Sequence, residues 1–180
     1  MEIVPIFKLP NTKLLAIKYD GQKRNAYEKL EEQWQSTDYL RKFFLKFKDD
    51  YFKEYGKRDL ANLVKDSKRL SYELFERLKR VAQNSNSIAK SFKPLDNRES
   101  EGITYEFQKL KTKGEERKSY LRIYAIKYRD SIIVTGGAIK LIKEMKKRPH
   151  TKSEINKLEL VRKFLEKDSP DLISGYLDIK

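Results

Sequence analysis

The sequence predicts an α+β fold, in which a small, antiparallel-rich twisted sheet is backed by N-terminal helices and followed by a C-terminal helix. Apolar residues recur every three or four positions over residues 23–85, alternate with polar residues in three segments over 102–135, and recur helically again after Pro149. Because the helical half and the three-strand half each need the other's apolar face, we expect a single domain over residues 1–180. The sheet and the last helix occupy residues 102–168.

The N-terminal part is expected to form one strand and then three helices. Residues 14–19 have the composition of an edge strand and end at the turn signal Asp20-Gly21. A helix begins near residue 23, a second follows the capping residues 36–38 and stops at Gly56, and a third begins at Asp59. Their apolar faces, which we expect to cover one face of the sheet, comprise Ala26, Leu30, Trp34, Leu40, Phe43, Phe44, Phe47, Tyr51, Leu60, Leu63, Val64, Leu70, Leu74, Phe75, Leu78 and Val81.

The sheet is predicted from three segments with the period-2 alternation of half-buried strands. In order, the expected elements are a strand at 103–107, a polar hairpin loop at 111–118, a strand at 121–126, a two-residue turn at Arg129-Asp130, a strand at 131–135, and a bend or bulge at Gly136-Gly137. The last helix follows Pro149, and Thr151 and Glu154 have the spacing of a capping box at its start.

Positive charge is concentrated in the second half of the chain. Of the formal net charge of +14, residues 109–152 contribute +10, from 14 basic and 4 acidic residues. Lys and Arg side chains neutralise phosphates and release counterions, so this pattern favours a nucleic-acid partner. The alternative is a charged surface that serves solubility alone.

Composition excludes several classes of protein. The chain has no cysteine, which rules out disulfides, thiolate zinc sites and a cysteine nucleophile. No Asp/Glu cluster has metal-ligand spacing, and Gly136-Gly137 lacks the spacing of a phosphate-binding loop, so we expect no metal and no cofactor. No apolar run approaches the roughly 20 residues of a membrane span, and the N-terminus lacks a signal-peptide pattern, so a cytoplasmic protein with no membrane partner is expected.

Three segments match, in order, a family pattern. Tyr105-Glu106-Phe107-Gln108 matches its Tyr/Phe-Glu-Leu-Arg element, and Tyr120-Leu121-Arg122-Ile123-Tyr124 matches its Tyr-Arg-Ile/Val-hydrophobic-Tyr element with one extra residue. Residues 132–143, followed by Pro149 and a helix, match an apolar strand that leads to a Phe-x-Lys-Lys segment. Over residues 92–166 the chain therefore resembles the RelE/ParE superfamily of bacterial toxins, and within it the HigB-like, phage-derived host-inhibition branch.

The resemblance implies a RelE-like fold whose open sheet face receives messenger RNA in the ribosomal A site. It also implies the toxin component of a type II toxin–antitoxin pair, acting as a metal-independent, ribosome-dependent mRNA endonuclease that inhibits translation. A cognate helix-turn-helix antitoxin is the implied protein partner. By the same resemblance, Arg122 stabilises the scissile phosphate, Lys140 and Lys143 hold the RNA, and Glu106 matches a family glutamate.

The candidate site combines this resemblance with the local pattern. Arg122 alternates with Leu121 and Ile123, so it is expected on the open face, where it acts on phosphate or pairs with Glu106. His150, the only histidine, is either a proton shuttle or a solvent-facing residue at a helix N-terminus. The proposed catalytic residues are Arg122, Lys140, His150 and Glu106, and the proposed nucleic-acid-binding residues are Lys109, Lys111, Lys143, Lys146, Lys147 and Arg148.

Two other functions remain open from the sequence. One is a non-catalytic module with the same fold that binds nucleic acid or protein; the long helical region and Gln108, which stands where the branch has arginine, favour it. The other is a gyrase inhibitor of the ParE type, which needs no catalytic residues.

Overall fold

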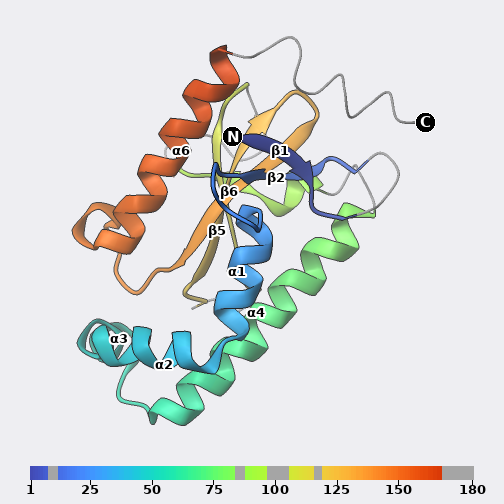
Figure 1. The fold of residues 1–180 in the computed structure, drawn as a ribbon. Helices are drawn as coiled ribbons and strands as arrows, with labels where there is room; N and C mark the ends of the chain where they lie inside the picture. The colour runs from blue at the N-terminus through green and yellow to red at the C-terminus, as the bar shows by residue number, and fades with distance from the viewer. Residues whose placement is uncertain (8–11, 84–87, 97–105, 116–118, 168–180) are drawn as a thin grey trace.

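The predicted α+β class is confirmed by a computed structural model, which describes residues 1–7, 12–83, 88–96, 106–115 and 119–167. At its centre is a six-stranded mixed sheet in the order β1-β2-β6-β5-β4-β3 (Figure 1). The strands are β1 (Glu2–Pro5), β2 (Leu14–Lys18), β3 (Lys93–Pro94), β4 (Lys109–Lys113), β5 (Leu121–Tyr128) and β6 (Ser131–Ile139). The helices are α1 (Ala26–Gln35), α2 (Thr37–Lys46), α3 (Lys48–Tyr55), α4 (Leu60–Ala82) and α6 (Pro149–Lys167), with 3-10 turns η1 (Ala89–Ser91) and η2 (Met145–Lys147).

The N-terminal strand of the prediction is an inner strand, so its assignment as an edge strand was wrong. β2 pairs antiparallel with β1 on one side and parallel with β6 on the other, where Leu14 lies opposite Ile132. Residues 14–17 are buried on both faces, which is typical of an inner strand that is covered on both sides. β1 supplies the edge of the sheet instead.

Three predicted helices are present, but the second is divided. Trp34 and its apolar partners in α1 are buried, and α1 begins with a capping box between Asn25 and Glu28. Phe47 has φ −118° and ψ 25°, outside the helical region, and it separates α2 from α3. α3 ends at Gly56, whose φ of 88° favours glycine, and Asp59 caps α4 as predicted.

The first strand of the predicted hairpin pair lies later than expected. Glu106 and Phe107 form a turn, and the strand that pairs with β5 is β4, in a segment that the sequence assigned partly to a loop. In β4, Leu110 and Thr112 are buried, whereas the lysines that alternate with them are not. Residues 103–105, which the prediction included, lie outside the described residues.

The predicted turn between β5 and β6 is confirmed, and β6 has a bulge one residue before the predicted Gly136-Gly137. Arg129 and Asp130 join the two strands, and Arg129 has a positive φ of 49°. Tyr124 lies opposite Gly136 and Ala125 lies opposite Val134, so Thr135 is the extra residue of a β-bulge. β6 continues through the bulge to Ile139.

The last helix begins two residues before the predicted capping box. Pro149 is its first residue, a position that suits proline because its missing N–H has no partner there anyway. Thr151 therefore lies inside the first turn, where its hydroxyl donates to Met145 O (2.5 Å) and Arg148 O (3.1 Å). Glu154 is buried against the sheet and does not cap the helix.

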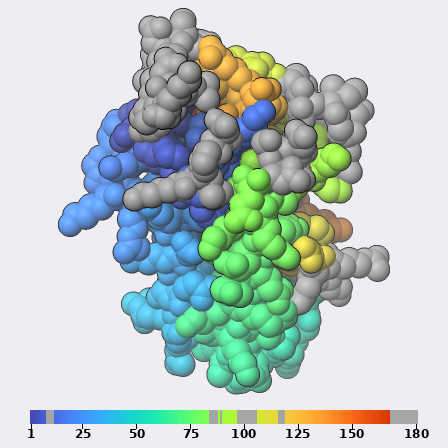
Figure 2. Space-filling view, turned by 90° about the vertical axis from the view of Figure 1, so that its right-hand side faces the viewer, coloured from blue at the N-terminus to red at the C-terminus, as the bar shows by residue number. Residues whose placement is uncertain are grey.

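Side chains are packed on both faces of the sheet. On one face α1, α2 and α4 bury the larger apolar cluster, which includes Trp34, Phe44 and Ile123. On the other face α6 packs through Leu158 and Val161 in a second cluster. Figure 2 shows α2, α3 and the start of α4, coloured cyan to green, gathered at one end of the molecule. The predicted arrangement of N-terminal helices behind a sheet is therefore present, with α6 on the opposite face (Figure 1).

Candidate nucleic-acid interface

A broad groove runs over β4 and β5, beside α6. Its volume is about 1,190 Å³. Among the described residues, its lining contains ten basic side chains and two acidic ones. The basic residues are Arg77, Lys90, Lys93, Lys109, Lys111, Lys113, Arg122, Lys140, Lys143 and Arg162; the acidic ones are Asp96 and Glu115. A concave surface with this excess of cations raises the local concentration of a polyanion.

The pairing of the strands places these cations side by side. Lys113 of β4 lies opposite Arg122 of β5, and Arg122 lies opposite Ala138 of β6. Residues directly opposite one another in an antiparallel pair share one face. On the next row of this face, Lys111 lies opposite Tyr124. On this face, Lys113 and Arg122 therefore lie beside the small residue Ala138, and Lys111 lies beside the aromatic ring of Tyr124.

Arg122 is held in place by the backbone at the start of its own strand. Its Nη1 donates to Ser119 O (2.5 Å) and to Leu121 O (2.9 Å). Burial lowers the pKa of Arg122, while the nearby Tyr124 and Tyr55 raise it, so the guanidinium keeps its charge. These contacts leave donors of the guanidinium for an anion in the groove, because Arg has five N–H groups.

Lys140 follows β6 and reaches the same place. Its backbone N–H donates to Tyr120 O (2.7 Å), which fixes the start of the segment after the strand. Burial lowers the pKa of Lys140, and the charges of Arg122 and Lys111 lower it further. Like charges disfavour the protonated form, so Arg122 and Lys111 lie close enough to Lys140 to affect it. An anionic ligand between them relieves that repulsion.

Tyr124 adds a neutral donor to this cluster. Its side chain is 1% exposed, and its hydroxyl has no hydrogen-bond partner among the described residues. Burial raises the pKa of Tyr124, so the phenol keeps its proton at neutral pH. A buried hydroxyl without a partner is costly, so this phenol is a strained feature of the groove wall.

The α6 side of the groove has a balanced charge. Lys109 Nζ forms an ion pair with Glu159 of α6, and that hydrogen bond lowers the pKa of Glu159. Arg162 contacts the same carboxylate at 3.4 Å and Glu166 at 3.6 Å. Lys109 therefore fastens β4 to α6, and the stronger positive potential lies around Arg122 and Lys140.

Several residues proposed from the sequence lie outside the groove. His150 lies in the first turn of α6 and is half-buried against α2. Its ring centroid is 4.7 Å from that of Phe47 and 5.1 Å from that of Phe43. Its Nε2–H donates to Ile139 O (3.0 Å). Burial lowers the pKa of His150, which favours the neutral ring. The structure thus gives this histidine a packing role and does not place it in the lining of the groove that contains Arg122.

Glu106 and Arg122 are also far apart along the sheet. Glu106 accepts a hydrogen bond from the backbone N–H of Arg129 (2.7 Å), at the turn that ends β5, whereas Arg122 lies near the start of β5. The ion pair between them that the sequence left open is therefore absent. Glu106 orders the turn between β5 and β6.

The basic residues before α6 divide between the groove and other contacts. Lys143 lines the groove. Arg148 instead holds Asp50 of α3 through two hydrogen bonds of 2.6 Å, and Lys147 pairs with Glu144 at 2.6 Å. Lys146 is exposed on η2 and is not among the residues that line the groove. This segment thus fastens α6 to α3 as well as contributing charge.

Sequence reasoning missed five basic residues of the groove, namely Arg77, Lys90, Lys93, Lys113 and Arg162. Arg77 comes from α4 and donates to Thr112 Oγ1 (2.9 Å) and Lys113 O (2.5 Å), so it links α4 to β4. The alternation of Lys109, Lys111 and Lys113 was the available signal for Lys113. No local pattern indicated Arg77, Lys90, Lys93 or Arg162.

Comparisons of the chain with protein-family models, with curated proteins and with solved structures found no match. Within the part of the chain that the structure describes, no three or more His, Asp or Glu side chains gather in a way that would hold a metal ion. In the same part, every helix is too short or too polar to cross a membrane. The site is therefore characterised by its geometry and charge.

Proposed function

We propose that this protein binds single-stranded RNA in the groove and cleaves it without a metal ion, as the toxin of a toxin–antitoxin pair that inhibits translation. The observation that carries the proposal is the gathering of Arg122, Lys140 and Lys111 in the lining of one groove, where burial lowers the pKa of Lys140 and the two other cations lower it further. The resemblance to RelE/ParE toxins supports the choice of messenger RNA as substrate and of a helix-turn-helix antitoxin as partner.

The chemistry follows from the charge of each group. A lysine with a lowered pKa has more of the neutral amine at neutral pH, and that amine is a general base. In the proposed reaction Lys140 accepts the proton of the ribose 2′-hydroxyl, whose oxygen then attacks the adjacent phosphorus. Arg122 stabilises the pentavalent phosphate, and the leaving 5′-oxygen gains a proton from an ammonium group of the groove.

The test is induced expression in a bacterial host that lacks an antitoxin, with growth and mRNA 5′-ends recorded together. Wild type is expected to arrest growth and to create new 5′-ends in phase with codons, and Arg122→Ala is expected to abolish both effects. The matched control is Arg41→Ala, which removes an exposed arginine on α2, outside the groove. If Arg122→Ala is as toxic as wild type, the groove is not the active surface.

A second candidate is a non-catalytic RNA-binding module, and the position of His150 favours it. His150 is the only histidine of the chain and lies outside the groove, so it is not available there for proton transfer. Normal growth and intact mRNA on expression, together with salt-sensitive RNA binding by the purified protein, would select this candidate.

A further inference from the structure

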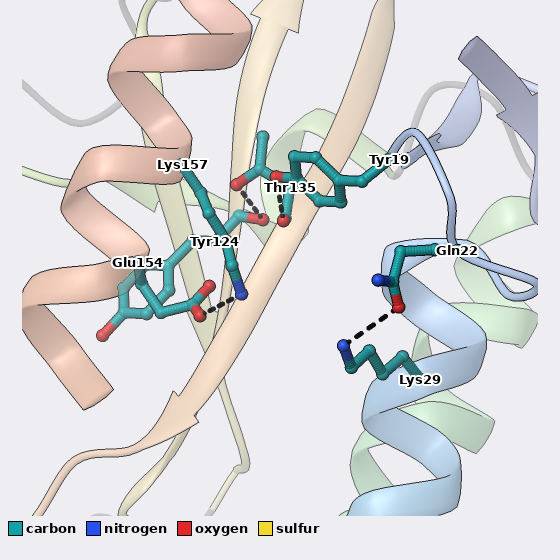
Figure 3. Close-up of polar contacts among 7 residues, drawn as sticks. All are labelled: Tyr19, Gln22, Lys29, Tyr124, Thr135, Glu154 and Lys157. Carbon is teal, nitrogen blue, oxygen red and sulfur yellow. Dashed lines mark hydrogen bonds and ion pairs between the residues drawn. The ribbon is translucent and has the colours of Figure 1, made fainter. Parts of the chain in front are cut away.

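A partly exposed aromatic ring lies in the lining of the basic groove. Among the described residues of that lining, two are aromatic, Phe107 and Tyr124. Tyr124 is 1% exposed, and Figure 3 shows its ring directed from β5 towards α6, beside Glu154. Phe107 is only half-buried. Of these two rings, Phe107 is therefore the one that a ligand in the groove can reach.

Phe107 continues the row of lysines on β4. These lysines occupy alternate positions of the strand, so their side chains share one face. Before β4, the Phe107 N–H donates to Lys127 O and the Lys127 N–H donates to Gln108 O, both at 2.9 Å, which extends the pairing with β5. The ring thus follows the lysines on the same face, at the end of the groove opposite the pair of Lys113 and Arg122.

The neighbouring strand holds this ring in place. The ring centroids of Phe107 and Tyr128 are 5.6 Å apart, and Tyr128 belongs to the apolar cluster on the α6 face of the sheet. Phe107 has a φ of 58°, which is uncommon for a bulky side chain. Such strained positions persist only where the surrounding structure maintains them, and they cluster at binding sites. The fold therefore keeps the ring at the groove in spite of an unfavourable backbone conformation.

We propose that Phe107 is a base-stacking site, on which an unpaired nucleobase of the bound RNA lies. The inference rests on the proposed RNA binding and adds that the bound strand has unpaired bases. Every nucleobase has a flat π-face, so an aromatic ring in a basic groove binds single-stranded RNA with little sequence preference. From Phe107 to Lys113 an extended backbone covers about 20 Å, so the base on Phe107 and the phosphate at Arg122 belong to different nucleotides of one strand.

A matched pair of RNAs separates stacking from charge. One is a short oligouridine, and the other is a backbone of the same length made of abasic nucleotides, which has the same phosphates and no bases. Binding of each to the full chain is measured by fluorescence anisotropy. Wild type is expected to bind the oligouridine about fivefold to one hundred fiftyfold more tightly, which is the contribution of one stacked base.

Three variants complete the test. Phe107→Gly removes the ring at a φ that glycine adopts without strain, so the fold should tolerate it. This variant should lose the preference for oligouridine and keep the salt dependence of wild type, because no charge is removed. Phe107→Tyr keeps a ring and should keep the preference. The matched control Tyr72→Ala removes a ring of α4 that is 62% exposed and lies outside the groove, and it should also keep the preference.

The outcomes distinguish the stacking site from the proposed function. A preference that persists in Phe107→Gly would overturn the stacking site and leave phosphate binding intact. Equal binding of both RNAs by wild type, with a steep salt dependence, would do the same. If wild type binds neither RNA, the proposed function fails and the stacking site fails with it.

Discussion

Removing one cation from the groove should change how steeply RNA binding depends on salt. Apart from Lys109, which pairs with Glu159, and Lys140, which is proposed to act as a neutral amine, four basic residues of the groove lie on β4, on β5 or after β6 and are the natural phosphate contacts: Lys111, Lys113, Arg122 and Lys143. For a single strand, the slope of log K against log salt is about −0.7 per neutralised phosphate, so four contacts give about −2.8. Affinity should then fall about fiftyfold between 50 and 200 mM salt.

Fluorescence anisotropy of a short labelled single-stranded RNA measures this slope directly. Arg122→Ala should make the slope less negative by about 0.7 and weaken binding at every salt concentration, whereas Arg41→Ala on α2 should leave the slope as in wild type. Lys113→Ala should behave as Arg122→Ala does, because the two residues lie opposite one another on β4 and β5. A wild-type slope near zero, or equal slopes for Arg122→Ala and Arg41→Ala, would refute the assignment of the groove to phosphate binding.

Three predictions concern stability, each measured by urea denaturation. Gly137→Ala should destabilise the fold by about 1–3 kcal/mol, because its methyl group would lie 2.5 Å from a β5 carbonyl oxygen; a wild-type midpoint would contradict this close approach. Leu158→Ala, at a fully buried position of α6, should cost about 2–5 kcal/mol, whereas Leu160→Ala, at a position that is 50% exposed, should stay within about 0.5 kcal/mol. The hydrogen bond from Arg148 lowers the pKa of Asp50. This pair therefore stabilises the fold above the ordinary Asp pKa, and its contribution is lost as pH falls through the lowered value. The stability difference between wild type and Asp50→Asn should accordingly shrink in acid, and a difference that does not depend on pH would exclude the linkage.

The elements that the sequence predicted well are those with a local, periodic signal. The spacing of Ala26, Leu30 and Trp34 identified α1, and Asp59 marked the start of α4, because caps and apolar faces are properties of short segments. The division at Phe47 was missed because the apolar pattern continues through it into α3. β1 was missed because it is only four residues long and ends in a proline.

The candidate site was predicted in part, because it is assembled from segments distant in the chain. Arg122, which strand alternation and the resemblance both indicated, and Lys140, which the resemblance alone indicated, line one groove. His150 was selected because it is the only histidine and histidine can transfer protons near neutral pH, yet its ring packs on Phe43 and Phe47 of the α2–α3 region. Arg77 comes from the middle of a helix whose sequence gives no sign that it reaches β4.

The parallel pairing of β2 with β6 has a consequence for synthesis of the chain. Leu14 pairs with Ile132, so more than two thirds of the chain must be translated before the central strands of the sheet can pair. The backbone hydrogen bonds within helices α1 to α4 are local, so these helices are able to form earlier, whereas pairing over such a separation is slow. A nascent chain that stops before β6 therefore lacks the surface formed by Arg122 and Lys140. Any toxicity that depends on this surface is thus delayed until translation of the chain is almost complete.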